Sequence, residues 1–226
     1  MSDALLAALD ATRGRIDAAS DGRAVTLVAV SKTRPPGDVR ALARHGQRDF
    51  GENYVQEALP KIAACSDLDL VWHFIGPLQS NKAREVAMHF DWVQSVDRPK
   101  LVEALARHRP ADRGPLDVLV QVNIDDEASK SGCRPGDVDG LARHIAAEPA
   151  LRLRGLMAIP DPGRDSGAPG GAFERLRGMF EALRAEHPGI DTLSMGMSDD
   201  YVEAIRHGAT MVRVGSALFG PRLPRA

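Results

Sequence analysis

The sequence predicts a closed (β/α)8 TIM barrel, an α/β fold in which eight parallel strands alternate with helices. Eight short apolar segments alternate with amphipathic helical patterns along the 226 residues, which is the order that parallel strands with crossover helices produce. Several segments are almost continuously apolar, such as VLV at 118–120, as expected of strands covered on both faces. An open doubly wound sheet is the alternative, because periodicity alone cannot show that the first and last strands pair.

One extra helix is expected before the repeating units, over residues 1–22. Four apolar residues recur near the helical period in it (Leu5, Leu6, Leu9 and Ile16), and SDG at 20–22 ends the run.

The repeating units follow in order. Strands are expected at 25–31, 49–51, 71–76, 92–95, 117–123, 154–159, 192–197 and 211–214. Helices are expected between them at 39–45, 82–89, 100–108, 138–147, 173–187 and 201–207. The Gly/Pro-rich segment 161–171 (DPGRDSGAPGG) is expected to be a flexible loop. No linker composition interrupts the pattern, so a single domain over residues 1–226 is expected.

Composition and charge argue against several partners and locations. The 29 Lys and Arg residues against 31 Asp and Glu give a formal net charge of -2, so nothing favours nucleic acid or a membrane surface. Apolar runs are too short to span a bilayer, and the first residues lack a signal-peptide pattern. The two cysteines form no CxxC pair and no metal-ligand spacing appears. We expect a cytoplasmic protein without a metal.

Polar residues follow the apolar segments where the predicted strands end. In a barrel of this kind the C-terminal ends of the strands form the face that carries active sites. The residues at those points are 31–32, 52–53, 76–81, 123, 198–199 and 213–216. Asn53 belongs to this set and is a candidate ligand-binding residue.

Lys32 directly follows the first apolar run, so its side chain should emerge at the mouth of the barrel. Partial removal from water disfavours the charged amine, which lowers its pKa and allows it to attack an aldehyde. The alternative is an ordinary lysine at a strand end that extends into solvent.

The segment VRVGS at 212–216 is a candidate phosphate site. Loops after the seventh and eighth strands of such barrels often bind phosphate through backbone N–H groups. Gly215 allows close backbone approach, and Ser216, Ser194 and Ser198 can supply hydroxyl groups. The alternative is an ordinary Gly/Ser turn, with Ser198 capping a helix. Together with Lys32, this corner describes a phosphorylated aldehyde or ketone that is bound covalently.

Seven sequence motifs in the chain match those of a known protein family. They are AVSKT (29–33), FGENYVQE (50–57), WHFIGPLQSNK (72–82), SKSG (129–132), RGLMAIP (154–160), LSMGMSDD (193–200) and VRVGS (212–216). In these motifs the chain resembles the pyridoxal-phosphate homeostasis proteins (the YggS/PROSC family), which are similar to the barrel domain of fold-type III alanine racemases.

The resemblance implies roles for individual residues. Lys32 would form a Schiff base with pyridoxal 5′-phosphate (PLP); Ser198, Gly215 and Ser216 would hold its phosphate; and Arg213 would lie beside the pyridine nitrogen. A permanently charged guanidinium there disfavours protonation of the ring, so the ring becomes a weaker electron sink.

Racemases of this type use a second base, a tyrosine from a partner's C-terminal β-domain, and the chain is expected to lack that domain. Neither Tyr54 nor Tyr201 lies in a segment that could replace it, so efficient racemisation is not expected. The expected function is therefore PLP homeostasis by storage, shielding or delivery, in a monomer with transient contacts to PLP-dependent enzymes and no catalytic residue. A weak racemase-like PLP enzyme and a cofactor-independent Schiff-base aldolase are the alternatives.

Overall fold

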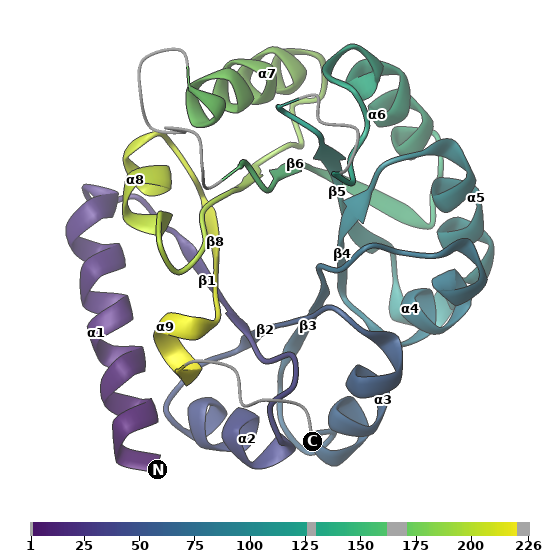
Figure 1. Ribbon diagram of the computed structural model, residues 1–226. Helices are drawn as coiled ribbons and strands as arrows, with labels where there is room; N and C mark the ends of the chain where they lie inside the picture. The colour runs from purple at the N-terminus through teal and green to yellow at the C-terminus, as the bar shows by residue number, and fades with distance from the viewer. Residues whose placement is uncertain (1, 126–129, 162–170, 221–226) are drawn as a thin grey trace.

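The strands form a closed, all-parallel barrel with the helices around it (Figure 1). The computed structural model describes residues 2–125, 130–161 and 171–220. Strand order follows the chain from β1 (Thr26–Val30) to β8 (Met211–Val214), and these two strands pair from Thr26↔Met211 to Ala29↔Val214. This closing pair confirms the (β/α)8 barrel and excludes the open sheet.

The other strands are β2 (Asp49–Glu52), β3 (Val71–Phe74), β4 (Trp92–Val96), β5 (Leu116–Val122), β6 (Leu151–Ala158) and β7 (Thr192–Ser194). The α-helices are α1 (Ser2–Ser20), α2 (Pro36–Arg44), α3 (Val55–Ala64), α4 (Ala83–His89), α5 (Pro99–His108), α6 (Val138–Ala146), α7 (Ala172–Glu186), α8 (Tyr201–Arg206) and α9 (Ser216–Phe219). Short 3-10 turns are η1 (Ser80–Lys82), η2 (Ala111–Arg113) and η3 (Pro135–Asp137). The extra helix α1 lies beside α8 on the outside of the barrel (Figure 1).

Several element boundaries differ from those expected, each for a local reason. Strand β6 begins at Leu151 instead of 154, because the charged residues there point to one side and form ion pairs, as Arg154 does with Asp117 and Asp191. Strand β7 ends at Ser194 instead of 197, since Gly196 has φ +93° and turns the chain. Helix α3 was not expected, and Pro60 lies inside it. Most of the expected loop 161–171 lies outside the described residues.

The barrel interior is partly polar. Large apolar side chains such as Phe50, Leu105 and Leu156 are fully buried. His73, Gln94 and Ser194 are also buried to 0% exposure, and buried polar groups of this kind require hydrogen-bond partners. His73 has such partners on both ring nitrogens.

Gly155 allows β6 and β7 to pair closely. It has φ +148°, and a Cβ atom there would lie 1.9 Å from the Thr192 carbonyl oxygen.

We expect Gly155→Ala to lower the free energy of unfolding by about 3 kcal/mol, because it adds both backbone strain and overpacking. Urea unfolding measures this. The matched control is Gly178→Ala within α7, where nothing lies within 4 Å; it should stabilise the protein by about 0.5–1 kcal/mol. Equal effects would contradict the assigned role.

The described residues contain no helix that is both long and apolar enough to cross a bilayer. Among the same residues, no three His, Cys, Asp or Glu side chains come together as a metal site would require.

Candidate functional site at the mouth of the barrel

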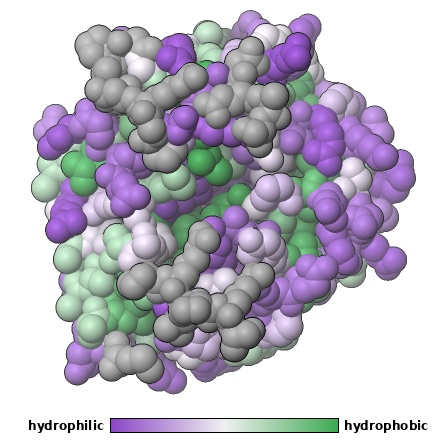
Figure 2. Space-filling model, viewed as in Figure 1, coloured by the Kyte–Doolittle hydropathy of each residue, from purple (hydrophilic) through white to green (hydrophobic). Residues whose placement is uncertain are grey.

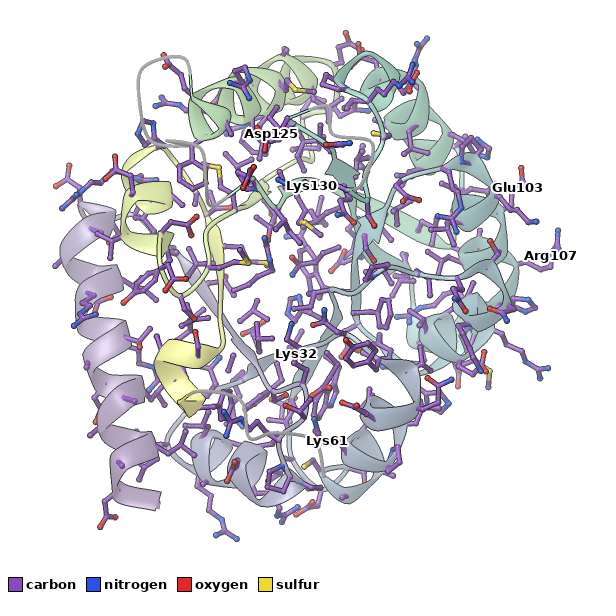
Figure 3. The ribbon with its side chains drawn as sticks, in the orientation of Figure 1. Lys32, Lys61, Glu103, Arg107, Asp125 and Lys130 are labelled. Atoms are coloured by element: carbon purple, nitrogen blue, oxygen red, sulfur yellow. The ribbon has the colours of Figure 1, made fainter. Side chains whose placement is uncertain are left out.

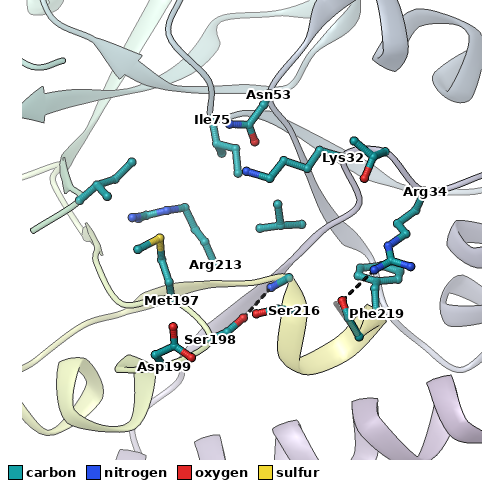
Figure 4. Close-up of a pocket in the computed structure, with 15 residues that line it drawn as sticks. Lys32, Arg34, Asn53, Ile75, Met197, Ser198, Asp199, Arg213, Ser216 and Phe219 are labelled. Carbon is teal, nitrogen blue, oxygen red and sulfur yellow. Dashed lines mark hydrogen bonds between the residues drawn. The ribbon is translucent and has the colours of Figure 1, made fainter. Parts of the chain in front are cut away.

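A pocket of about 230 Å³ opens at the C-terminal ends of the strands. The face in Figure 2 is hollowed near its centre, and hydrophobic residues are visible in the hollow. Six of the seven predicted site residues line the pocket together: Lys32, Asn53, Ser198, Arg213, Gly215 and Ser216 (Figure 4). Ser194 does not line it.

Lys32 follows β1 and occupies a tight turn. Arg34 N donates to Ser31 O at 3.0 Å, so Lys32 and Thr33 are the two central residues. Thr33 has φ +63°, an unfavourable conformation for a β-branched residue, and its N–H donates to Glu57 Oε2 at 3.3 Å. Strain of this kind costs about 1–3 kcal/mol and is tolerated where the surroundings hold the backbone in place. The Lys32 side chain extends from this turn toward Ile75 and Asn53 (Figure 4).

A buried ion pair lies behind this turn. Lys61 on α3 donates to Ser31 O at 2.7 Å and forms an ion pair with Glu52, and the Ser31 hydroxyl donates to Glu52 Oε1 at 2.6 Å. Burial raises the pKa of Glu52, while the charge of Lys61 opposes that rise. Figure 3 marks Lys61 on the same side of the barrel as Lys32. Sequence reasoning missed Lys61; the only available signal was a lysine among the apolar residues of the segment 55–64.

Arg213 reaches into the pocket from β8 and is almost completely buried. Its Nη1 donates to Ser194 Oγ at 2.6 Å and its Nη2 to Ala158 O at 2.9 Å. Burial lowers the pKa of this guanidinium to about 10, so it remains charged at neutral pH. The two hydrogen bonds fix its plane, and Ser194 therefore supports Arg213 from below the pocket.

Another wall of the pocket is the corner between β7 and α9. Gly215 N and Ala217 N donate to Ser198 Oγ at 3.1 and 3.2 Å. Two backbone N–H groups thus converge on one oxygen position, beside the exposed Ser216. Gly215 has φ -118°, and a Cβ atom there would make ordinary contact with Val30. Its backbone conformation therefore does not demand glycine.

Asn53 brings an unpaired polar atom to the pocket. Its Oδ1 is buried and lacks a hydrogen-bond partner among the described residues. Its backbone is held against the next strand end, since a Cβ atom at Gly76 would lie 2.2 Å from Asn53 O. A ligand with a suitable donor would satisfy this atom.

Few groups near the pocket can exchange protons. Within the described chain, Asp199 is the only carboxylate among the lining residues, which include no tyrosine, histidine or cysteine. Tyr201 is buried outside the pocket, and Tyr54 is exposed outside it. Burial raises the pKa of the Cys133 thiol to about 12, so it stays protonated.

The chain is similar to characterised proteins over most of its length. The model of the alanine racemase N-terminal domain matches residues 5–223. The pyridoxal phosphate homeostasis protein of Pseudomonas aeruginosa is 56% identical over 205 residues, which cover 91% of this chain and 88% of that protein. Its counterpart in Escherichia coli K12 is 50% identical over 201 residues, covering 88% and 86%.

Solved structures give the same picture. PipY of Synechococcus elongatus PCC7942, solved with PLP bound, has a TM-score of 0.84 and 36% identity, covering 96% of this chain and 100% of PipY. Alanine racemase of Corynebacterium glutamicum has a TM-score of 0.73 at 17% identity and is covered to 60%, which shows a shared fold alone. The chain belongs to the alanine racemase N-terminal domain family and, within it, to the group of pyridoxal phosphate homeostasis proteins.

Proposed function

We propose that this protein binds PLP as a Schiff base on Lys32 and serves to store, shield or deliver the cofactor. The observation that carries the proposal is that Lys32, the buried Arg213 and the Ser198–Ser216 corner line one pocket. The names of its relatives and the PLP-bound PipY structure support the same ligand. The unpaired Oδ1 of Asn53 fits a site that a polar ligand completes.

The residues divide the work of binding. Lys32 would hold PLP through its amine, which would form a carbon–nitrogen double bond with the aldehyde carbon and release water. The phosphate would be held by the hydroxyls of Ser198 and Ser216 and by N–H groups at the start of α9, including that of Gly215. Arg213 would face the pyridine nitrogen and, as a fixed cation, disfavour its protonation. PLP can supply an electron sink when bound, and this environment weakens it.

A weak PLP-dependent enzyme is the second candidate, supported by the fold that the chain shares with alanine racemase. Racemisation requires proton transfer on both faces of a substrate carbon. A positioned acid or base contributes a factor of about 10²–10⁴ to the rate. Apart from Lys32, the described pocket lining contains only Asp199 as a proton acceptor. Incubation of the PLP-loaded protein with single amino-acid enantiomers, followed by chiral chromatography, should detect no turnover. Turnover that disappears in Lys32→Ala would favour the enzyme.

Titration of the purified protein with PLP tests the proposal. A visible absorbance band should appear with saturable, one-to-one stoichiometry, and borohydride should bleach it as the double bond is reduced. Absence of the band would exclude the Schiff base. Survival of the band in Lys32→Ala would exclude Lys32 as its site.

Delivery can be tested separately, because it requires release. The PLP-loaded protein should reactivate an apo-form of a PLP-dependent enzyme at a rate that an excess of a PLP-trapping amine reduces only partly. If the trap abolishes reactivation, the cofactor is transferred through solution. Direct delivery would then be excluded, and storage or shielding would be the remaining roles. We place this exchange in the cytoplasm and expect the carrier to act as a monomer, which size-exclusion chromatography with light scattering measures.

Replacement of Arg213 by glutamate should change the absorbance of bound PLP. A carboxylate beside the ring nitrogen favours its protonated form, whereas the guanidinium disfavours it. Arg213→Met is the matched control, since it removes the charge without reversing it and should give an intermediate spectrum. Circular dichroism checks the fold, because Arg213 is buried. Identical spectra in all three proteins would contradict the placement of Arg213 beside the ring.

A further inference from the structure

A continuous chain of hydrogen bonds, here called the interior relay, crosses the barrel below the pocket. Arg213 Nη1 donates to Ser194 Oγ at 2.6 Å, and the Ser194 hydroxyl donates to Gln94 Oε1 at 2.7 Å. Gln94 Nε2 lies 3.1 Å from His73 Nδ1, and His73 Nε2 lies 2.9 Å from Asp49 Oδ1. The relay runs from β8 through β7, β4 and β3 to Asp49, the first residue of β2.

The donors and acceptors of the relay permit one consistent direction. A guanidinium can only donate, so Ser194 accepts from Arg213 and must give its own proton to Gln94 Oε1. The amide nitrogen of Gln94 then faces His73 Nδ1 and can only donate to it. Nδ1 therefore carries no proton, and the neutral Nε2–H tautomer of His73 donates to the Asp49 carboxylate.

The burial of the relay residues and the charges at its two ends indicate what the relay does. Ser194, Gln94 and His73 are fully buried, so each link that is lost would leave an unsatisfied polar group in a medium of low dielectric constant. The hydrogen bonds of Arg213 go to neutral oxygens. The relay thus joins a buried cation to a carboxylate whose side chain is 26% exposed near the opposite end of the barrel.

Neighbouring aromatic and charged groups hold the histidine end of the relay. His73 stacks on Trp92 with ring centroids 5.3 Å apart, and the Arg154 guanidinium lies 4.8 Å from the centroid of Trp92. Arg154 is itself paired with Asp117 and Asp191. These contacts leave the His73 ring little freedom to rotate.

We propose that Ser194, Gln94 and His73 are positioning residues for Arg213. Through the interior relay they orient its guanidinium toward the pocket, with Asp49 as the terminal acceptor. This inference deepens the proposed function and rests on it where PLP is concerned. Ser194, expected from the sequence to bind the cofactor, acts in this account through Arg213.

The first experiment needs no cofactor. In protein labelled with ¹⁵N-histidine at pH 7, long-range ¹H–¹⁵N correlation should show His73 as the neutral Nε2–H tautomer, with signals assigned by their absence in His73→Gln. In Gln94→Glu the carboxylate can no longer donate to Nδ1, so His73 should gain a second proton. Ser95→Ala is the matched control, since Ser95 is buried next to Gln94 and its hydroxyl has no partner among the described residues. An Nδ1–H tautomer in the unmodified protein would overturn the relay.

The second experiment measures PLP affinity by titration. Ser194→Ala should weaken binding about tenfold, the effect of losing one hydrogen bond to a charged group, and Ser194→Thr should restore it. In an Arg213→Met background the Ser194→Ala substitution should add nothing, since both act as one unit. Ser95→Ala should bind normally. Equal losses from Ser194→Ala in both backgrounds would overturn the positioning role. If the unmodified protein binds no PLP, the proposed function fails, while the tautomer measurement still decides the relay.

Discussion

Lys32→Ala is expected to abolish covalent retention of PLP while the barrel remains folded. Alanine cannot form the carbon–nitrogen double bond, so the visible band and its response to borohydride should both disappear. The hydrogen bonds described for Arg213 go to Ser194 and Ala158, and those described for the Ser198 hydroxyl come from Gly215 and Ala217. Weak, non-covalent binding of PLP should therefore persist and can be measured by equilibrium dialysis.

The fold should tolerate this change because Lys32 is half-buried at the pocket and lies outside the packed core. A substitution outside the core is expected to change the free energy of unfolding by about 1 kcal/mol or less. The matched control is Lys100→Ala on α5, an exposed lysine that does not line the pocket, which should keep full covalent binding. A large fall in melting temperature for Lys32→Ala alone would contradict the placement of Lys32.

Lys61→Met is expected to lower the free energy of unfolding by about 3–5 kcal/mol at neutral pH, since it removes the cation that offsets the burial of the Glu52 carboxylate. It also removes the donor to Ser31 O, and so loosens the turn that carries Lys32. PLP affinity should fall as well. Lys82→Met is the surface control: Lys82 and Glu85 are partly exposed and 3.3 Å apart, and such a pair contributes at most about 1 kcal/mol.

The loss caused by Lys61→Met should depend on pH in a defined direction. Burial raises the pKa of Glu52 above its usual 4.5, and Lys61 opposes this rise; without Lys61 the pKa rises further. When a carboxyl group has a higher pKa in the folded protein than in the unfolded chain, the free energy of unfolding falls as the pH increases above the unfolded-chain pKa, here 4.5. The variant should therefore be most destabilised at neutral pH and approach the unmodified protein toward pH 5. Glu52→Gln combined with Lys61→Met should remove most of the pH dependence; a constant loss between pH 5 and 8 would contradict a buried ion pair.

The sequence predicted the elements that have strong periodicity and missed those that depend on tertiary contacts. Apolar runs located all eight strands within a few residues, but only the pairing of β1 with β8 shows that the sheet closes. The end of β7 depends on Gly196, whose φ of +93° no apolar pattern reveals.

The same distinction applies to the candidate site: the sequence places residues near strand ends, but it does not show which side chains meet in the folded protein. Residues at or near the ends of strands, such as Lys32 and Arg213, could be placed at the mouth because every parallel strand ends there. Ser194 has the same position in the sequence pattern, yet its hydroxyl is occupied by Arg213 and Gln94 below the pocket. Lys61 and Gln94 come from other elements and meet their partners only through the three-dimensional packing, which sequence spacing does not report.

The most direct test of the account is the mass of the lysine peptides after PLP and borohydride treatment. The protein is incubated with PLP, reduced, digested and analysed by tandem mass spectrometry. The account predicts that the added cofactor mass lies on the peptide containing Lys32, and that it is lost from that peptide when borohydride is omitted. Cofactor mass on the peptide of another lysine, such as Lys61, or on no peptide would contradict the central claim.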